Sequence, residues 1–531
     1  MAAVAFAAVA GMAPAADLRG TLVDVAGKPV GGAFVTALLV ERGLAVTVVS
    51  DAAGHYHLPD LFPAAHRLRI TRQGYAPQVI ESVTVAPAGS TQDARLEAGG
   101  DVAAQTPGYA WLAALPPGPY KARFITGCTI CHDPGAERVR LQRTHAEWVT
   151  AIDWMRNRKL DVYSVIPNFD SAELATWLVD NRFGERPAAV PPLDPGRDAT
   201  AGTVIREYAV GDLGTWAHDM VVEPATGAAW VVDYPYDHLV RIEPDSGRQE
   251  LHVIPVKHAG AHTTHFDRDG YLWITLQLAD KVARFDPRNG EFKIYAGFQQ
   301  GSLIHSFAYD DQGLVSYDAQ GRMWLSEFGK NAIASLNPET GEIREYPLPG
   351  NAGHTYGIAL DSKGRAWYTK YNENAFGVLD PATGKVDEQQ LPRPDSAPHR
   401  MSIDDRDRLW IPLSGYGELA MYDTASGKLE QIALPEPDTF PYATRYDGAT
   451  DTVWIAGNGA SSLYRYDPSS GRFDSVRLPS PHSYPRMIAF DYVRGDVWTS
   501  LANYPTKHTG RESGTVVRIS GVSAPTRTTA D

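Results

Sequence analysis

The chain has 531 residues, 43% hydrophobic and 21% charged, a composition typical of soluble globular proteins and a length that allows about three domains. Its formal net charge of −14 argues against binding to nucleic acid or to an anionic membrane surface. Beyond the first 16 residues no hydrophobic run is long enough to span a bilayer, so the sequence does not predict an integral membrane protein.

Residues 1–16 form an apolar run that ends in small residues. This pattern indicates the hydrophobic region and cleavage site of a secretory signal peptide, although the basic n-region is missing. A membrane anchor is the alternative, but the run is shorter than the roughly 20 residues that a spanning helix needs. We therefore expect an exported protein, periplasmic in a bacterium.

Residues 17–97 are predicted to form a compact β module. Short strands are expected at 20–24, 33–40, 45–50, 55–58 and 68–71, separated by Gly, Pro and Asp turns. The runs Gly27-Lys-Pro-Val-Gly-Gly-Ala, Asp51-Ala-Ala-Gly-His-Tyr-His-Leu and Gly74-Tyr resemble the carboxypeptidase regulatory-like domain, a transthyretin-like β-sandwich. That resemblance implies a packing or adhesion unit without chemistry. Residues 98–115 and 186–202 are rich in Ala, Pro and Gly and are predicted to be linkers.

The only two cysteines of the chain, Cys128 and Cys131, are followed directly by His132. A C-x-x-C-H run is the attachment signature of c-type haem: the two thiols bind the porphyrin and the imidazole ligates the iron. A disulfide or half of a zinc site are the alternatives. A four-ligand zinc site would need more Cys or a spaced His pair nearby, and His145 is the only other His close by.

Residues 141–156 read as a helix, with apolar residues at Trp148, Val149, Ile152 and Met155. Thr144 and Glu147 have the spacing of a capping box at its start. Met155 is predicted to be the second axial ligand of the haem, because it shares a helix face with Trp148 and Ile152. A thioether ligand would raise the reduction potential of the iron. Two alternatives stay open: Met155 fills the core, or His145 is the distal ligand.

A second helix is expected at residues 171–181. With the C-x-x-C-H run, this arrangement resembles the cytochrome c family over residues 107–185, and we place the α-helical cytochrome c domain at 116–185. The resemblance implies Cys128 and Cys131 as thioether sites, His132 as proximal ligand and Met155 as distal ligand, with haem c as the cofactor.

From residue 203 onwards the sequence repeats. Seven tryptophans recur at intervals of 43, 51, 43, 43, 44 and 44 residues: Trp230, Trp273, Trp324, Trp367, Trp410, Trp454 and Trp498. An acidic residue precedes each tryptophan, and a turn such as Asp380-Pro-Ala-Thr-Gly follows each of the first six. Seven units of four short strands predict a seven-bladed β-propeller over residues 203–521, with a tail at 522–531.

The repeats also predict how the propeller closes. Arg206-Glu-Tyr near the start matches Arg344-Glu-Tyr, which ends a middle blade. Residues 203–210 are therefore expected to supply the outer strand of the last blade, next to a third strand at 515–520. This pairing would remove two open sheet edges.

Aligning the repeats identifies one position on each innermost strand, five residues before the acidic turn residue: His218, His262, His305, Tyr356, His399, Tyr442 and Arg486. The third blade fits only if residues 310–318 form a longer turn. Inner strands line the central channel of a propeller, so these residues are predicted to form a ring. His354 is expected just above it, and Asp233, Glu327 and Lys370 toward the same mouth.

Two interpretations of this ring stay open. It is either a wet polar channel with ordered water, or a functional site. Converging neutral imidazoles are ligands for Cu, Fe or Zn, which makes His218, His262, His305 and His399 candidate metal ligands. The candidate catalytic residues, with Tyr, Glu and Arg as acid, base and anion holder, are His262, His399, Tyr356, Glu327 and Arg486.

The repeats resemble the virginiamycin B lyase (streptogramin lyase) family over residues 203–521. The match lies in Gly353-His-Thr-Tyr-Gly-Ile-Ala-Leu-Asp-Ser-Lys-Gly-Arg-Ala-Trp-Tyr-Thr, in Trp324-Leu-Ser-Glu and in the D-P-x-T-G turns. The resemblance implies elimination at a cyclic depsipeptide ester, with Mg²⁺ held by glutamates and a histidine as base. Glu327 fits the W-x-x-E pattern, whereas Lys370 stands in the neighbouring blade.

Three functions are compatible with this sequence. The first is a periplasmic oxidoreductase that passes electrons between a substrate or metal site in the channel and the haem, and on to a redox partner protein or a quinone-linked chain. The second is a Mg-dependent lyase on a cyclic ester or lactone. The third is a non-enzymatic electron-transfer cytochrome with binding modules. We rank them in this order, because a lyase has no use for a one-electron carrier.

Overall fold

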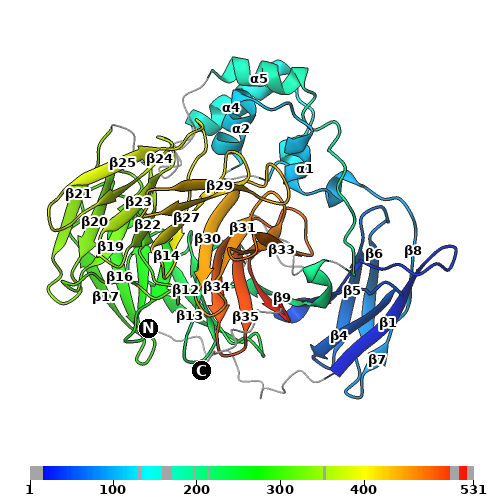
Figure 1. The fold of residues 1–531 in the computed structure, drawn as a ribbon. Helices are drawn as coiled ribbons and strands as arrows, with labels where there is room; N and C mark the ends of the chain where they lie inside the picture. The colour runs from blue at the N-terminus through cyan, green and yellow to red at the C-terminus, as the bar shows by residue number, and fades with distance from the viewer. Residues whose placement is uncertain are drawn as a thin grey trace.

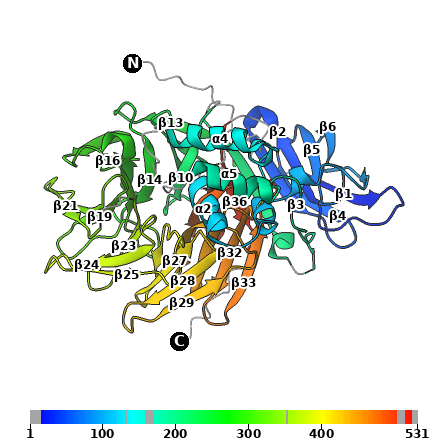
Figure 2. The same cartoon turned by 90° about the horizontal axis from the view of Figure 1, so that it is seen from above.

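The computed structural model describes residues 16–129, 133–157, 170–196, 198–211, 214–350, 354–502 and 513–522. A β-sandwich, a group of helices and a seven-bladed β-propeller pack together (Figure 1). Seen from above, α2, α4 and α5 lie over the middle of the propeller, and the sandwich lies outside one blade (Figure 2). The signal peptide predicted at residues 1–16 lies outside the described residues except for Ala16. Within the described ranges no helix is long and apolar enough to cross a membrane.

The predicted sandwich over residues 17–97 is confirmed as two packed sheets. One sheet holds β1 (Ala16–Asp24), β4 (His55–Leu61), β7 (Ser90–Thr91) and β8 (Ala94–Leu96). The other holds β2 (Phe34–Leu39), β3 (Leu44–Val49), β5 (Ala65–Thr71) and β6 (Gln78–Thr84), with the short helix η1 (Val40–Arg42) between β2 and β3. Buried and exposed side chains alternate along β4 and β5, as expected for strands with one face in the core.

The propeller blades run from the channel to the rim in chain order. Blade 1 is β10 (Ala217–Val222), β11 (Ala229–Asp233), β12 (His238–Ile242) and β13 (Gln249–Val253). Blade 2 is β14 (Ala261–Phe266), β15 (Leu272–Leu276), β16 (Lys281–Asp286) and β17 (Glu291–Ala296), with η4 (Gln277–Ala279) after β15. Blade 3 is β18 (Ile304–Phe307), β19 (Met323–Glu327), β20 (Ala332–Leu336) and β21 (Ile343–Pro347).

The next three blades repeat this pattern. Blade 4 is β22 (Thr355–Leu360), β23 (Ala366–Lys370), β24 (Ala375–Leu379) and β25 (Val386–Gln390). Blade 5 is β26 (Ser402–Ile403), β27 (Arg408–Leu413), β28 (Glu418–Asp423) and β29 (Leu429–Ala433). Blade 6 is β30 (Pro441–Asp447), β31 (Thr452–Gly457), β32 (Ser462–Asp467) and β33 (Arg472–Arg477).

The repeated acidic residue and tryptophan are partners within a blade. In four blades the indole Nε1 donates a hydrogen bond of 2.7–2.9 Å to the aspartate six residues earlier, as in Asp318–Trp324 and Asp361–Trp367. The tryptophans lie on the second strands and are buried between blades. The fixed spacing in the sequence therefore reflects a bond that joins the first turn of a blade to its second strand.

Blade 7 closes the ring as the sequence predicts. It contains β34 (Pro485–Asp491), β35 (Asp496–Leu501), β36 (Gly514–Ser520) and β9 (Val204–Val210), and β36 pairs with β9 in antiparallel register, for example Val517 with Glu207. The other edge of β9 pairs with β3 of the sandwich, where Ala45 lies opposite Glu207. One eight-stranded sheet therefore runs from the channel through blade 7 into the sandwich.

The helices form a cap over the propeller, which we call the helical cap. It comprises α1 (Gly108–Ala113), α2 (Pro119–Cys128), α3 (Glu137–Arg140), α4 (His145–Asn157) and α5 (Ser171–Asp180), preceded by η2 (Ala103–Gln105); η3 (Ala199–Gly202) follows it. The helices predicted at 141–156 and 171–181 are confirmed. So is the capping box, in which the Thr144 N–H donates to the Glu147 carboxylate at 2.8 Å.

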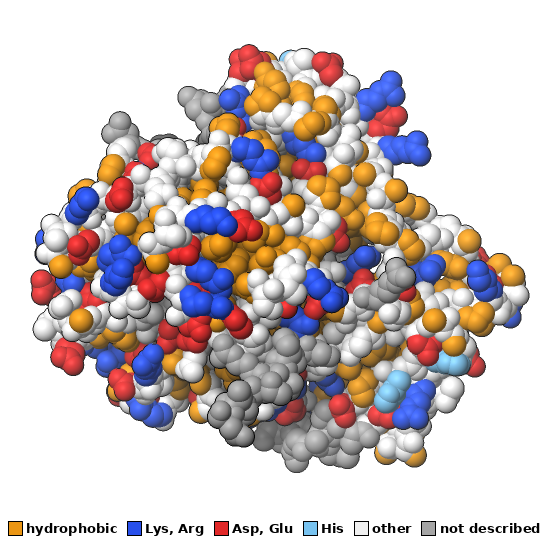
Figure 3. Space-filling model, in the orientation of Figure 1, with side chains coloured by type: hydrophobic (Ala, Val, Ile, Leu, Met, Phe, Trp, Pro, Cys, Tyr) orange, Lys and Arg blue, Asp and Glu red, His pale blue; other side chains and the backbone are white. Residues whose placement is uncertain are grey.

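The prediction of a linker at residues 98–115 is wrong over α1. This helix buries Trp111 and Leu112 in the core of the cap, together with Phe124, Ile125 and Trp148. The same apolar cluster includes three propeller residues, Phe440, Tyr484 and Ala502. Figure 3 shows hydrophobic side chains gathering where the cap meets the blades. The cap and the propeller therefore share a core.

Candidate functional site

The seven aligned inner-strand residues form a ring around the channel, which we call the channel ring. Neighbouring side-chain rings lie close together, with centroid distances of 3.9 Å for His218–His262, 4.2 Å for His262–His305 and 4.2 Å for His305–Tyr356. The next pairs around the ring are Tyr356–His399 at 4.5 Å and His399–Tyr442 at 4.9 Å. The predicted ring is thus confirmed, including His305 in the third blade.

A local feature of the backbone aims these side chains into the channel. In six blades the pairing of the innermost strand with the second strand shifts at the ring position, for example between Ala217 and Asp219 and between Thr355 and Ile358. Such a β-bulge twists the strand and redirects its side chains. Every ring side chain is buried, with at most 3% of its surface exposed.

Hydrogen bonds join one arc of the channel ring. The Tyr356 hydroxyl donates to the Tyr442 oxygen at 3.0 Å, and Arg486 donates to the same oxygen at 2.8 Å. Arg486 also lies 3.1 Å from Nε2 of His218, whose Nδ1 lies 3.0 Å from the His262 carbonyl oxygen. Because a guanidinium only donates, His218 must be neutral, with its proton on Nδ1.

The same reasoning gives the tautomers of two other imidazoles. Arg400 donates toward Nδ1 of His262 at 3.2 Å, so the proton of His262 lies on Nε2. Ser414 uses its hydroxyl proton on the Pro441 carbonyl, so His399 must donate its Nδ1 proton to the Ser414 oxygen. The Nε2 lone pair of His399 is therefore available inside the channel.

Burial keeps the ring histidines neutral. It lowers the pKa of His399 to about 3 and holds the pKa values of His218, His262 and His305 well below their ordinary range. The Arg400 and Arg486 guanidiniums lower them further. Among the described residues, Nε2 of His262, His305 and His399 has no hydrogen-bond partner. Such buried polar atoms need water or a ligand to satisfy them.

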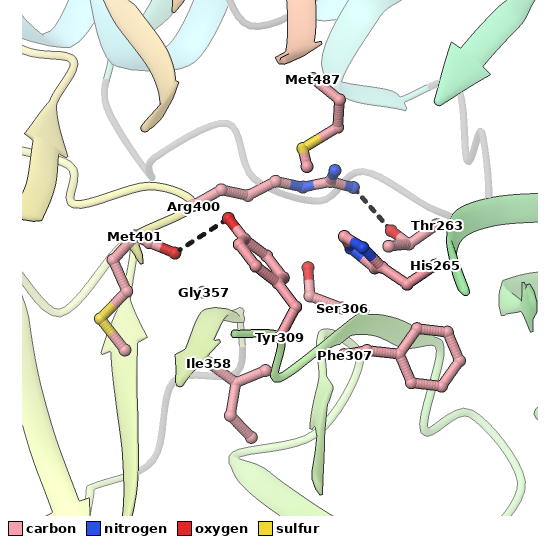
Figure 4. A pocket seen from close by; sticks show the side chains of 10 residues that line it. All are labelled: Thr263, His265, Ser306, Phe307, Tyr309, Gly357, Ile358, Arg400, Met401 and Met487. Atoms are coloured by element: carbon pink, nitrogen blue, oxygen red, sulfur yellow. Dashed lines mark hydrogen bonds between the residues drawn. The ribbon is translucent and has the colours of Figure 1, made fainter. Parts of the chain in front are cut away.

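One residue further along each strand lies a second layer of polar side chains that the alignment of the repeats does not identify. Arg400 crosses the channel and forms an ion pair of 2.7 Å with Asp219. It also donates to the Thr263 hydroxyl at 2.8 Å (Figure 4). A cavity of about 10 Å³ remains beside Arg400, lined also by His265, Ser306 and Tyr309. This volume suits one water molecule. Both residues of the ion pair directly follow a ring residue, which is the sequence signal that could have found them.

The far end of the channel is closed by the long turn of the third blade. Tyr309, which directly precedes this turn, reaches across the channel to the carbonyl oxygens of Met401 and Thr444, at 3.4 and 3.3 Å. The Tyr309 ring stacks on His265 at 4.6 Å, and the Arg445 guanidinium lies 4.8 Å from the centre of the same ring. The extra turn predicted at residues 310–318 is confirmed, and together with Tyr309 it plugs the channel.

The near end of the channel ring is covered by aromatic side chains. We call them the aromatic collar: Trp216, Tyr234, Phe328, Tyr371 and Tyr484. Three of them stand four residues after a repeated tryptophan, which is a second signal in the repeats that could have identified them. Tyr371 packs on His399 at 4.6 Å, and Phe328 packs on His305 at 5.4 Å.

The collar contacts the helical cap directly. The Tyr371 hydroxyl donates to the Thr126 carbonyl at 2.7 Å, and the Tyr484 hydroxyl donates to the Thr129 carbonyl at 2.5 Å. Thr126 and Thr129 belong to the segment that carries Cys128. Next to these bonds, Lys121 forms an ion pair of 2.6 Å with Asp438. The segment around the C-x-x-C-H run thus lies on the mouth of the channel.

The residues predicted near the same mouth behave differently from one another. His354 packs on Phe328 at 4.8 Å, one layer above the ring, and burial lowers its pKa to about 4. Glu327 lies beside Ser302 and beside Glu345 of the outer strand β21; burial raises its pKa to about 8. Lys370 forms ion pairs with Glu373 and Glu388 and also points toward the rim. The structure therefore does not bring Glu327 or Lys370 to the channel ring.

Asp233 is also buried near the mouth. Its carboxylate accepts a hydrogen bond of 3.0 Å from the Trp216 N–H, and burial raises its pKa to about 7. His238 on the next strand lies 3.7 Å away. These contacts place Asp233 behind the aromatic collar rather than in the ring.

The predicted haem residues are only partly described. Cys128 is the last residue of α2 and is half-buried against the core of the cap, whereas Cys131 and His132 lie outside the described residues. Met155 lies near the end of α4 with 40% of its surface exposed, next to Trp154 at 49%. His145 lies 3.1 Å from the Ala172 carbonyl through Nε2. Met155 as distal ligand stays a prediction.

No group of three or more His, Cys, Asp or Glu in the described ranges could hold a metal ion. His218, His262 and His305 lie side by side in the ring, and Tyr356 separates them from His399, so the four imidazoles do not converge on one point. A transition metal or Mg²⁺ in the channel is therefore a prediction without geometric support.

Comparison with known proteins identifies two segments. Residues 196–422 match the model of the virginiamycin B lyase family, and residues 17–99 match the carboxypeptidase regulatory-like domain. The propeller is similar to the virginiamycin B lyases. Neither match covers the helical cap, so the haem rests on the sequence motif alone. No curated protein matches the chain.

Solved structures agree with this fold. The virginiamycin B lyase of Staphylococcus aureus is 22% identical, with a TM-score of 0.51, and the match covers 60% of this chain and 99% of that one. A streptogramin B lyase structure is 21% identical, with a TM-score of 0.50 and coverages of 60% and 97%. A catalytically inactive S. aureus virginiamycin B lyase, solved with quinupristin, is 23% identical, with a TM-score of 0.51 and coverages of 60% and 99%. At these identities the likeness shows the fold alone.

Proposed function

We propose that the protein is an exported c-type cytochrome that exchanges electrons between its haem and the channel of a virginiamycin B lyase-like propeller. The observation that carries this proposal is the contact between the C-x-x-C-H segment and the channel mouth through Tyr371 and Tyr484. A haem attached to this segment would lie beside the aromatic collar. A short distance between the haem and the channel would favour electron transfer between them.

The described residues of the cap are compatible with haem. Cys128 ends α2 against an apolar cluster that also holds Trp148 and Ile152. Trp154 and Met155 expose apolar surface at the end of α4, which a porphyrin could cover. Cys128 and Cys131 would hold the haem, with His132 and Met155 on the iron, and the bound haem would supply one-electron transfer.

The channel ring would contribute a buried and fixed polar environment. Its imidazoles are neutral, and the ring contains no carboxylate. Tyr356 and Arg486 both donate hydrogen bonds to the Tyr442 oxygen, which holds these polar groups in place. A water molecule in the channel would meet the Nε2 proton of His262 and the Nε2 lone pair of His399. Electrons would leave through a redox partner protein or a quinone-linked chain, in the periplasm if residues 1–16 direct export.

The test is expression in a host that matures c-type cytochromes, followed by the haemochrome spectrum and metal analysis by mass spectrometry. We expect one covalently bound haem iron per chain, and its loss in Cys128→Ser. Ser426→Cys changes the number of thiols in an exposed turn far from the cap. This control variant should keep the haem. A wild-type chain without covalent haem would exclude the proposal.

The same preparation tests the channel metal. A second metal at about one equivalent, lost in His262→Ala and His399→Ala, would establish a metal site at the ring. Haem iron alone would leave the ring as a polar site without a transition metal.

Lyase activity is the second candidate, because the family match covers most of the propeller. Against it, the channel ring is buried and closed at both ends, and Glu327 points toward the rim. Incubation with quinupristin and Mg²⁺, followed by mass spectrometry, separates the two candidates. We expect the cyclic compound to remain intact, and a linear product would favour the lyase.

A further inference from the structure

We propose that Tyr371, Tyr484 and His482 form a seat on the propeller that positions the haem-attachment segment. This inference rests on the proposed function, since it concerns the haem. Tyr371 lies in the loop after β23 of blade 4, and the other two lie in the loop from blade 6 to blade 7. Each bonds a different residue between 126 and 133. The contacts bracket Cys128, Cys131 and His132 from both sides along the chain.

The first two contacts complete the end of α2. The last four carbonyls of a helix have no partner within the helix and need one from elsewhere. Thr126 belongs to this last turn, and Thr129 is the residue after it. The hydroxyls of Tyr371 and Tyr484 supply their donors from the propeller, at 2.7 and 2.5 Å. Both hydrogen bonds are buried, so water does not replace them easily.

The third contact holds the other side of the segment. Asp133 directly follows His132, and its buried carboxylate lies 2.7 Å from Nδ1 of His482. The Gly135 N–H donates to the same oxygen at 2.7 Å. A Cβ at Gly135 would stand 2.4 Å from the His482 ring, so only glycine lets the imidazole approach. The residue after the proximal ligand is thus anchored to blade 7.

The seat is itself held by the channel ring. The Tyr371 ring packs on His399 at 4.6 Å and on Tyr356 at 5.9 Å. The Arg486 guanidinium lies 5.6 Å from the Tyr484 ring. Ring, seat and the described residues Thr126, Thr129 and Asp133 therefore form one continuous set of contacts. The seat fixes the distance and orientation of the haem relative to the ring.

A purely structural role, in which the tyrosines only attach the cap, makes different predictions. It affects the stability of the whole protein and leaves the haem properties unchanged. Positioning instead affects the haem potential and the local dynamics of residues 121–135. The test therefore measures these two quantities on the full-length holoprotein.

The variants are Tyr371→Phe, Tyr484→Phe and their combination, which keep the aromatic rings and remove the hydroxyls. Tyr295→Phe is the matched control, because the Tyr295 hydroxyl also donates to a carbonyl, that of Pro338, at 2.9 Å but at the rim. We expect amide hydrogen exchange over residues 121–135 to increase about 5- to 10-fold for each lost hydrogen bond. The haem reduction potential should shift in both single variants and further in the double variant.

The control should change neither quantity. His482→Phe gives an independent test from the other side of the segment, with the same expected increase in exchange around Asp133. An unchanged potential and unchanged exchange in the double variant, with haem present, would overturn the seat and leave the proposed function intact. A wild-type chain without haem would overturn the proposed function and the seat together.

Discussion

Glu207 is a carboxyl residue enclosed between the sandwich and the last blade. It lies on β9, between β3 and β36, and neither carboxyl oxygen has a hydrogen-bond partner within the described ranges. Burial raises its pKa from 4.5 to about 7, and Arg69 lowers it only in part. At neutral pH and above, folding must therefore bury an ionised carboxylate with incomplete compensation.

Glu207→Gln is expected to stabilise the protein in alkaline solution. Because the folded-state pKa is raised, ionisation of this carboxyl costs no stability below pH 4.5; stability is lost as the pH rises from 4.5 to about 7 and stays lost above it. The shift corresponds to about 3 kcal/mol at most, so we expect a gain of about 1–3 kcal/mol at pH 8 and almost none at pH 4.5. Denaturant unfolding at both pH values measures the difference. Glu339→Gln, in an exposed turn, is the control, and equal effects of the two variants would contradict the prediction.

The seven ring residues could be predicted because the sequence repeats seven times. Each blade supplies an independent copy of the same position, and the alignment of His218 with His262 needs no structure. Arg400 and Asp219 could not be found in this way. Along a regular strand, the residue after a ring residue would lie on the opposite face. The β-bulges instead turn the ring residue and the residue after it into the channel. The contacts of Tyr371 with Thr126 depend on docking between distant segments.

The long turn of blade 3 is an element that the repeat pattern predicts only as an insertion. Gly313 lies in it with a φ of 80°, and its carbonyl accepts the Nδ1 proton of His265 at 3.0 Å. A Cβ at this position would stand 1.8 Å from the Arg445 guanidinium, which is buried between the rings of Tyr309 and Phe490. Close packing of this turn on Arg445 is what closes the far end of the channel.

Gly313→Ala is expected to destabilise the protein more than Gly321→Ala. Both glycines have positive φ values, 80° and 71°, so each alanine carries a backbone penalty of about 1 kcal/mol. A Cβ at Gly321 meets no atom within 4 Å, whereas at Gly313 it clashes with Arg445. We expect an additional loss of about 1–3 kcal/mol for Gly313→Ala, measured by thermal unfolding. Equal losses in the two variants would show that the turn does not pack tightly on Arg445.

At the scale of helices and strands, the sequence predicts most elements. Strands, turns and the two longer helices follow from periodicity and capping, as Thr144 and Glu147 illustrate. Helix α1 was missed because its surroundings are rich in Ala, Pro and Gly, which also mark linkers. Its helical state depends on burial of Trp111 and Leu112 against α2 and the other cap residues, which is tertiary information.

For the whole molecule, the main difference from the predicted fold is the continuous sheet between the sandwich and the propeller. The sequence gives no sign that β3 pairs with β9, because any strand edge of suitable length has the same backbone groups. The pairing covers the outer edge of blade 7 over residues 205–208. An open edge of this length is a site for association between chains.

Deletion of residues 16–97 is therefore expected to cause self-association through β9. Light scattering and sedimentation velocity should show dimers or larger species, whereas the full-length chain gives none through this edge. The matched control is the same deletion with Ala209→Pro. The Ala209 N–H donates to the Gly43 carbonyl of the sandwich at 2.7 Å, so proline removes a donor only from the newly opened edge. A monomeric deletion variant would contradict the prediction.

The shared strand also sets an order of events during synthesis. Residues 204–210 leave the ribosome before any blade exists, and their partner β36 is made last, after almost the whole propeller. Strand β3 is already present by then, because the sandwich precedes β9 in the chain. Pairing with β3 would therefore cover one edge of β9 before β36 is made. In this way the sandwich would cover the closing strand until the final blade is made.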